Sequence, residues 1–313
     1  MRELLQSFLN RSASHASNII YIQLYEHDNL RESYLRFSTR TRLNIWSIAK
    51  VFVVMAAGIA ESEGLISLNE YIYPEFEQYF PKQACENLYH ITIRHLLTMT
   101  SGISDPLFFC DGKERYHEKD WISYFFQKGD FRYFPGTWFC YSNFNTYILS
   151  SLIENRSGAN LLEYTRYRLF DKIGITNPDW TNCPLGHCMA ANGLYVTIDE
   201  LASFCHMILH HGVFNGVSVV PQDFVIDACR KQFDTTEAAE IMKDPYEKYG
   251  YGYTIRLTSA PGRIFLGGNY GQYCVIDFKN HAVACVMSLD GNNHKKIRND
   301  LLDAFDDYYG SGK

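Results

Sequence analysis

The sequence predicts an α+β fold in which an antiparallel sheet is flanked by helices and a mostly helical region is inserted between its strands. Apolar segments of strand length lie near both ends of the chain, and those near the C-terminus follow one another over short turns. The middle of the chain shows helical patterns and loops instead. Consecutive strands of this kind pair antiparallel and pack beside helices. We therefore expect a discontinuous sheet domain at 1–64 and 191–313, and a mostly helical domain at 65–190.

Local signals justify the elements expected before residue 191. Gly64 ends a long apolar helix, because glycine readily takes the left-handed conformation that follows a helix. Asn160 and Glu163 have the spacing of a helix-start capping box. The expected elements are a helix over 3–12, strands at 18–25 and 34–38, the helix before Gly64, a helix around His95, an aromatic stretch at 121–126, and helices over 143–158 and 161–172.

The C-terminal part is expected to be rich in strands. Thr197 and Glu200 have capping-box spacing and open a helix that Gly212 closes. Runs rich in isoleucine, valine and aromatic residues follow. The expected elements are strands at 251–257, 263–267, 272–278 and 282–289, and a final helix over 295–308.

A serine and a lysine lie three positions apart at the start of the long apolar helix. Ser47 and Lys50 fall on one helix face, so the lysine amine can reach the serine hydroxyl. Serine becomes a useful nucleophile when an adjacent base takes its proton, and Ser–Lys pairs are one such arrangement. The alternative is a structural role, with Ser47 capping the helix and Lys50 extending to solvent. The uncharged run 51–60 favours a buried helix and hence a catalytic pair.

A second polar group follows a Pro-Gly turn about ninety residues later. Tyr141 and Asn143 stand on this loop, just before an amphipathic helical run. A phenol near an ammonium group can act as a general base, and an amide can hold a substrate carbonyl.

These motifs resemble the serine β-lactamase and penicillin-binding-protein superfamily, in particular its class C-like serine hydrolases. The segment 93–103 is similar to the helix after the nucleophile in that family, and 190–202 is similar to its "GGLYST…DLA" segment. The resemblance covers nearly the whole chain and implies the β-lactamase/transpeptidase-like fold. It also implies an acyl-enzyme mechanism in which Ser47 is the nucleophile, Lys50 and Tyr141 handle the proton and Asn143 positions the acyl group.

The third catalytic element departs from the family pattern. Family members carry Lys-Thr-Gly or His-x-Gly on an inner strand, whereas this chain has Leu266, Gly267 and Gly268 followed by Asn269 and Tyr270. By position, the backbone N–H of Asn269 would join that of Ser47 in an oxyanion hole, and the other four residues would contact substrate. The alternative is that the glycines mark a strand bend or a close backbone approach.

The missing cation favours an ester or amide of a small molecule or peptide over a penicillin. Two other interpretations remain open. One is a β-lactamase or D-alanyl-D-alanine carboxypeptidase in which another cation, such as Arg263, takes the missing place. The other is a non-catalytic binding or sensor module on the same fold.

Composition and charge exclude several other classes. The chain has 313 residues and a formal net charge of −6 without a block of like charges, which gives no case for nucleic acid or an anionic membrane. We expect no membrane span and no cofactor. Scattered cysteines predict free thiols and a cytoplasmic location, with export after removal of a signal peptide as the alternative. Cys183, His187 and Cys188 could begin a zinc site, but we favour a loop with free thiols and no metal. The oligomeric state is left open.

Overall fold

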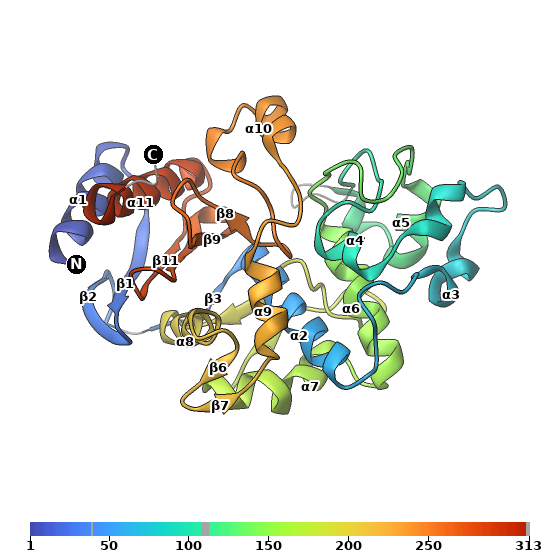
Figure 1. Ribbon diagram of the computed structural model, residues 1–313, viewed down its shortest axis with the longest axis horizontal. Helices are drawn as coiled ribbons and strands as arrows, with labels where there is room; N and C mark the ends of the chain where they lie inside the picture. The colour runs from blue at the N-terminus through green and yellow to red at the C-terminus, as the bar shows by residue number, and fades with distance from the viewer. Residues whose placement is uncertain (39, 108–112, 311–313) are drawn as a thin grey trace.

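The computed structural model describes residues 1–38, 40–107 and 113–310. Its main feature is a six-stranded antiparallel sheet with the order β2-β1-β11-β10-β9-β8 (Figure 1). The N-terminal strand β1 pairs with the last strand, β11, so the two ends of the chain build one sheet. The strands are β1 (Ile19–Glu26), β2 (Asn29–Leu35), β8 (Arg256–Leu257), β9 (Arg263–Gly268), β10 (Gln272–Asp277) and β11 (Ala282–Ser288). This arrangement confirms the predicted α+β class.

Helices cover both faces of this sheet. The terminal helices α1 (Arg2–Ser14) and α11 (His294–Tyr309) pack on one face, where Phe8, Ile22 and Phe305 share an apolar core. Helix α8 (Ile198–Leu209) packs on the other face against β1, β10 and β11. Its predicted capping box forms: the Thr197 side chain accepts from the Glu200 N–H, and the Glu200 carboxylate accepts from the Thr197 N–H.

The larger core surrounds α2 (Ala49–Ser62), whose residues 49–60 are all buried. A helix without a polar face must be covered on all sides, as the apolar sequence predicts. It packs against α6 (Asn143–Ser157) from the helical region and α9 (Gln222–Cys229) from the C-terminal part. Because Lys50 lies in the first turn of α2 and Ser47 in the 3₁₀ turn directly before it, this packing fixes both residues in the molecule.

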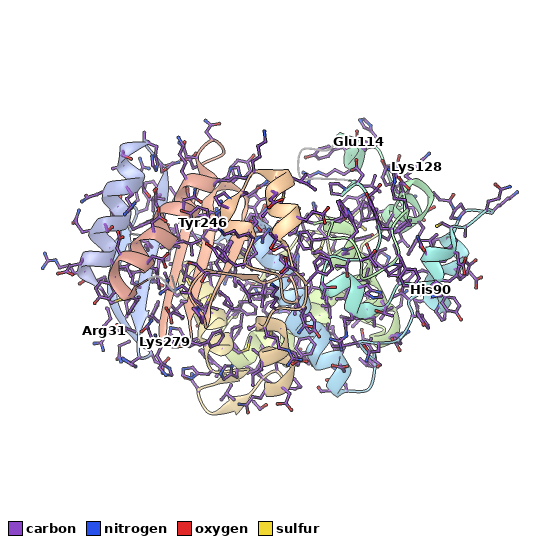
Figure 2. The ribbon with its side chains drawn as sticks, turned by 45° about the horizontal axis from the view of Figure 1, so that its top comes forward. Arg31, His90, Glu114, Lys128, Tyr246 and Lys279 are labelled. Carbon is purple, nitrogen blue, oxygen red and sulfur yellow. The ribbon has the colours of Figure 1, made fainter. Side chains whose placement is uncertain are left out.

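The helical region lies to one side of the sheet. It contains α3 (Tyr73–Phe76), α4 (Ile93–Leu97), α5 (Trp121–Lys128), α6 and α7 (Leu161–Thr165). In Figure 2, His90 and Lys128 lie on this side, and Arg31 and Lys279 lie on the sheet side. A small sheet consists of β3 (Leu43–Asn44), β4 (Asp179–Trp180) and β5 (Leu194–Val196). Its strands β4 and β5 pair although they lie on opposite sides of the domain boundary expected at residue 190. The division into domains at that residue stays a prediction.

Three expectations about the elements were wrong. The strand expected at 34–38 is β2, which begins at Asn29 and ends at Leu35. Between α8 and the late strands, where no element was expected, the structure has α9, α10 (Thr236–Met242) and a hairpin of β6 (Val213–Phe214) with β7 (Val217–Ser218). The strand expected over 251–257 is reduced to β8. The helix expected over 161–172 is α7 followed by a π-helical turn at Arg166–Phe170 and a 3₁₀ turn at Asp171–Ile173. These differences depend on backbone geometry that short-range sequence patterns do not specify.

Candidate active site

Ser47 and Lys50 are in hydrogen-bond contact. Ser47 lies in a 3₁₀ turn, Trp46–Ile48, that runs directly into α2. The Lys50 Nζ donates to Ser47 Oγ at 2.9 Å and to the backbone oxygen of Ala191 at 3.0 Å. Lys50 is only 1% exposed, so it does not extend to solvent as the structural alternative requires. The predicted pair therefore forms, with the amine held between the serine and a backbone carbonyl.

Tyr141 joins the pair from the loop before α6. The Lys50 Nζ lies 4.9 Å from the centre of the Tyr141 ring, and Tyr141 and Ser47 line the same cavity. The loop is fixed at Ser142, whose hydroxyl caps α6 by accepting from the Phe144 N–H and donates to the Pro106 oxygen. Asn143 is the first residue of α6 and lines the same cavity as Ser47.

Arg256 is a second cation at this site, and the sequence analysis missed it. Its guanidinium carbon lies 4.9 Å from the centre of the Tyr141 ring, and it also contacts the ring of Tyr251. The Arg256 Nε donates to Glu247 at 2.7 Å, and Arg298 contacts the other oxygen of Glu247 at 3.2 Å. The only local signal was an arginine in an otherwise strand-like apolar run, which does not reveal its neighbours.

The two cations shift the protonation equilibrium of Tyr141. Burial acts to raise the pKa of the phenol, because it disfavours the charged phenolate. The charges of Lys50 and Arg256, with smaller contributions from the polar groups of Ser47 and Lys50, outweigh burial, so the pKa of Tyr141 lies below its ordinary value. By contrast, burial raises the pKa of the neighbouring Tyr251. A phenol with a lowered pKa can accept a proton near neutral pH.

The end of β9 reaches the serine turn through a close backbone contact. A Cβ atom on Gly268 would lie 2.4 Å from the Ile45 oxygen and 3.2 Å from the Trp46 Cβ, so only glycine fits this approach. Asn269 follows in a 3₁₀ turn, Asn269–Gly271, and lines the cavity together with Gly267 and Gly268. The Tyr270 ring stacks on Trp46 at 4.8 Å between ring centres. Gly268 therefore permits a close approach of two backbone segments, as the structural alternative for these glycines proposed. The same approach brings the turn that begins at Asn269 next to the turn that contains Ser47.

Leu266 and Arg263 lie elsewhere. The Leu266 side chain is 1% exposed, belongs to the larger core, and is not among the residues that line the cavity. Arg263 pairs with Asp277 at 2.8 Å and with Asp306 at 2.6 Å, and its side chain is 2% exposed. Neither residue lines the serine cavity, whereas Arg256, on the neighbouring strand β8, does.

The site opens into a cavity of about 540 Å³. Aromatic side chains form much of its wall, and a charged border lies at one end. Its aromatic lining comprises Trp46, Trp138, Phe139, Tyr141, Phe265 and Tyr273, and its charged lining comprises Asp244, Glu247, Arg256, Lys295 and Arg298. The volume suits a small molecule or a short peptide segment.

Other histidines and cysteines singled out from the sequence have structural partners. His95 Nδ1 accepts from the Thr92 N–H at 3.1 Å, which completes a helix cap. In the suggested zinc cluster, Tyr147 donates to Cys183, His187 contacts Glu154 at 2.5 Å, and Cys188 donates to Asn160. The three side chains therefore point to different partners, as expected for a structural loop.

Comparison with known proteins agrees with this geometry. The structure of EstCE1, a hydrolase with promiscuous acyltransferase activity, matches with a TM-score of 0.76 at 14% identity over 97% of this chain and 98% of that one. A penicillin-binding protein from Bacillus halodurans matches with a TM-score of 0.70 at 16% identity over 95% and 99%. A protein assigned as a 6-aminohexanoate-dimer hydrolase from Bacillus anthracis gives 0.79 at 19% identity over 95% and 80%. These structures are similar in fold, and a model of the Beta-lactamase family matches residues 25–305. The chain belongs to the Beta-lactamase family.

Proposed function

We propose that this protein is a serine hydrolase that uses Ser47 as its nucleophile and acts on an ester or amide of a small molecule or peptide. The observation that supports this most directly is the hydrogen bond from Lys50 to Ser47 beside the Tyr141 ring, in a cavity that Ser47 and Tyr141 both line. A non-catalytic binding module would have no need for a buried lysine on a serine hydroxyl, because burying a charge without a use costs stability.

The proton would move between Ser47 and Tyr141. As Ser47 Oγ forms its bond to the substrate carbonyl carbon, its proton passes to the Tyr141 phenolate, which the charges of Lys50 and Arg256 stabilise. When the carbon–oxygen or carbon–nitrogen bond breaks, Tyr141 returns that proton to the leaving alcohol or amine. Water then attacks the acyl-enzyme in the same way and releases the acid.

The negative charge on the carbonyl oxygen also needs donors. We place the backbone N–H groups of Ser47 and Asn269 in this role, since the approach at Gly268 brings the end of β9 to the serine turn. One such donor contributes about 3 kcal/mol in comparable sites. The Asn143 amide, at the start of α6, would hold the acyl carbonyl. Gly267, Gly268 and Tyr270 would border the substrate, whereas the position of Leu266 supports packing instead.

Arg256 favours a second candidate within the same reaction class. The absence of a cation at Leu266 was the reason for preferring neutral substrates, and Arg256 brings a guanidinium to the cavity from another strand. A guanidinium binds a carboxylate with charge-assisted hydrogen bonds. Substrates with a carboxylate near the scissile bond, including penicillins and D-alanyl peptides, are therefore the second candidate.

Location in the cell is a separate proposal. Within the described ranges, no helix is both long and apolar enough to cross a membrane. The described cysteines are free thiols, which supports a cytoplasmic location.

Active-site labelling tests the proposed nucleophile. The protein would be incubated with a fluorophosphonate, a fluorescent penicillin and a short-chain chromogenic ester, followed by intact-mass measurement and peptide mapping. We expect one fluorophosphonate adduct, on Ser47, that Ser47→Ala abolishes. An adduct on another residue would refute the assignment, and the absence of both labelling and turnover would favour the non-catalytic module.

A further inference from the structure

A cluster of two histidines and one aspartate lies at the far edge of the main sheet from the serine. His206 lies in the last turn of α8, and His210, four positions later, is the C-cap residue of the same helix, so both lie on the same side of its C-terminal end. Asp28 comes from the turn between β1 and β2, and Figure 1 shows α8 close to that end of the sheet. Tyr25, on β1, packs edge-on against the His206 ring at 4.7 Å.

One oxygen of Asp28 faces both imidazoles. Asp28 Oδ1 lies 2.7 Å from His210 Nε2 and 3.2 Å from His206 Nδ1, and the three potential ligand atoms all lie within 4.8 Å of one another. The Asp28 contact with His206 lacks hydrogen-bond geometry, and neither His206 ring nitrogen has a hydrogen-bond partner among the described residues. Leaving a largely buried imidazole nitrogen without a hydrogen-bond partner costs stability. The orientation of the His206 ring toward Asp28 and His210 therefore requires an explanation.

The backbone fixes the carboxylate in this position. His27 and Asp28 have φ values of 48° and 62°, so both central residues of the β1–β2 hairpin turn are left-handed. Such a two-residue turn has little freedom, because its twist must match the strands it joins. The histidines are equally fixed by their helix.

The cluster is accessible to a dissolved ion. It borders a separate cavity of about 600 Å³, which shares none of its lining residues with the serine cavity. A second carboxylate there, Asp199, already contacts Arg40 at 3.0 Å and accepts from Gln23 at 2.8 Å. Side-chain exposure is 57% for Asp28 and 41% for His210, against 12% for His206.

From this geometry we propose that Asp28, His206 and His210 bind a divalent transition-metal ion, with Zn²⁺ as the leading candidate and water completing the coordination. Imidazole ligands favour Zn²⁺, Cu²⁺ and Ni²⁺ over Mg²⁺ and Ca²⁺. Zinc takes nitrogen and carboxylate oxygen at about 2.0–2.2 Å, so tetrahedral ligand atoms are about 3.4 Å apart. The cluster reaches this spacing with small side-chain rotations.

The ion would join the β1–β2 hairpin to α8, and so stabilise the sheet edge. This proposal does not depend on the hydrolase mechanism.

Metal titration of the full chain tests the site. Protein without a polyhistidine tag would be stripped with a chelator, desalted and titrated with Co²⁺ and Zn²⁺, with Mg²⁺ as the comparison. We expect one equivalent of Co²⁺ to give the visible absorption of a tetrahedral site, displacement of Co²⁺ by Zn²⁺, and a melting temperature that rises with Zn²⁺ concentration. Mg²⁺ should produce neither effect.

Variants at the two exposed ligands identify the residues. His210→Gln and Asp28→Asn should each weaken Co²⁺ binding at least about tenfold, in line with the loss of one ligand or its support. His15→Gln is the matched control, because His15 also contacts a carboxylate, Asp300, at 2.8 Å. The proposal is overturned if the unmodified protein shows no tetrahedral Co²⁺ absorption, or if binding survives both ligand variants or is lost in the His15 control.

Discussion

At the residue scale, the main feature of the candidate active site is that two cations lie close to the Tyr141 ring. Lys50 and Arg256 each lie 4.9 Å from the centre of its ring, and together they outweigh the effect of burial on its pKa. Opposite charges at this distance favour the ionised form of an acid. The Ser47–Lys50 contact could be predicted from their spacing, but the arginine could not.

Removal of either proton-handling group should reduce turnover strongly. Lys50→Ala and Tyr141→Phe are each expected to lower kcat at least about a hundredfold, the lower end of general acid–base contributions. The losses should combine less than multiplicatively, since the two groups act as a unit. A double-mutant cycle on ester hydrolysis measures this, and full additivity would mean that they act on separate steps.

Loss of Arg256 should move the acidic limb of the kcat/KM profile to higher pH. The arginine lowers the pKa of Tyr141, so Arg256→Met raises that pKa and delays formation of the phenolate as pH increases. At neutral pH we expect kcat/KM to fall at least about tenfold, the value of one charged interaction. Arg256→Lys should restore part of the loss.

The matched control for Arg256 is Arg42→Met. Arg42 forms a two-bond ion pair with Glu200, at 2.5 and 2.6 Å, outside the residues that line the serine cavity. An unchanged pH profile in Arg256→Met, or an equal shift in the Arg42 control, would separate the arginine from the proton transfer. Comparing carboxylate-bearing with neutral esters in the Arg256 variants also distinguishes the two candidate substrate classes.

At the scale of elements, β9 and the serine turn depend on one glycine. The Gly268 backbone lies so close to Ile45 that a Cβ atom would overlap the Ile45 oxygen. For residues 266–270 the sequence analysis offered a catalytic interpretation and, as the alternative, a structural role for the glycines. The structure shows the close contact at Gly268, and Asn269 directly follows it. Capped helices such as α8 could be predicted well, whereas β8, α9 and α10 depend on pairings and packing that local patterns do not contain.

Gly268→Ala should impair catalysis by moving β9 away from Ser47. The added Cβ atom would clash with the backbone oxygen of Ile45, which cannot move aside as a flexible side chain can. The strand end would therefore shift, and Asn269 would be displaced from the serine turn. A misplacement of about 1 Å can cost about a hundredfold in rate, so we expect a loss of kcat in the range of about ten- to a hundredfold. Steady-state kinetics beside a thermal melt would measure it; normal kcat in a folded variant would contradict the role of this approach.

At the scale of the whole molecule, the two ends of the chain meet in one sheet, where β1 pairs with β11. A buried ion pair then connects this sheet to the C-terminal helix. Arg263 on β9 contacts Asp277 on β10 and Asp306 on α11, so it connects the sheet to the terminal helix. Its burial explains why it does not reach the catalytic cavity. The resemblance stated from the sequence identified the right family, but its suggestion of Arg263 as a catalytic cation was not supported by this placement.

Arg263→Met should therefore reduce stability rather than chemistry. Breaking a buried pair leaves the Asp277 carboxylate uncompensated, which costs about 3–5 kcal/mol. Urea denaturation should show the lower free energy of unfolding, while kcat per folded molecule should stay close to that of the unmodified protein. A selective loss of kcat at unchanged stability would return Arg263 to the active site.

From the sequence by itself, a resemblance carried by several ordered motifs indicated the family, and local patterns predicted the α+β class and the pairing of Ser47 with Lys50. Spacing and periodicity carry this information because they reflect which residues share one face of a helix or strand. Only the tertiary structure decided that Arg256 lies beside Tyr141, that Leu266 packs in the core and that Asp28 contacts two histidines. Each of these contacts joins segments far apart in the chain, and the pairing of strands and packing of helices, not local sequence, brings them together.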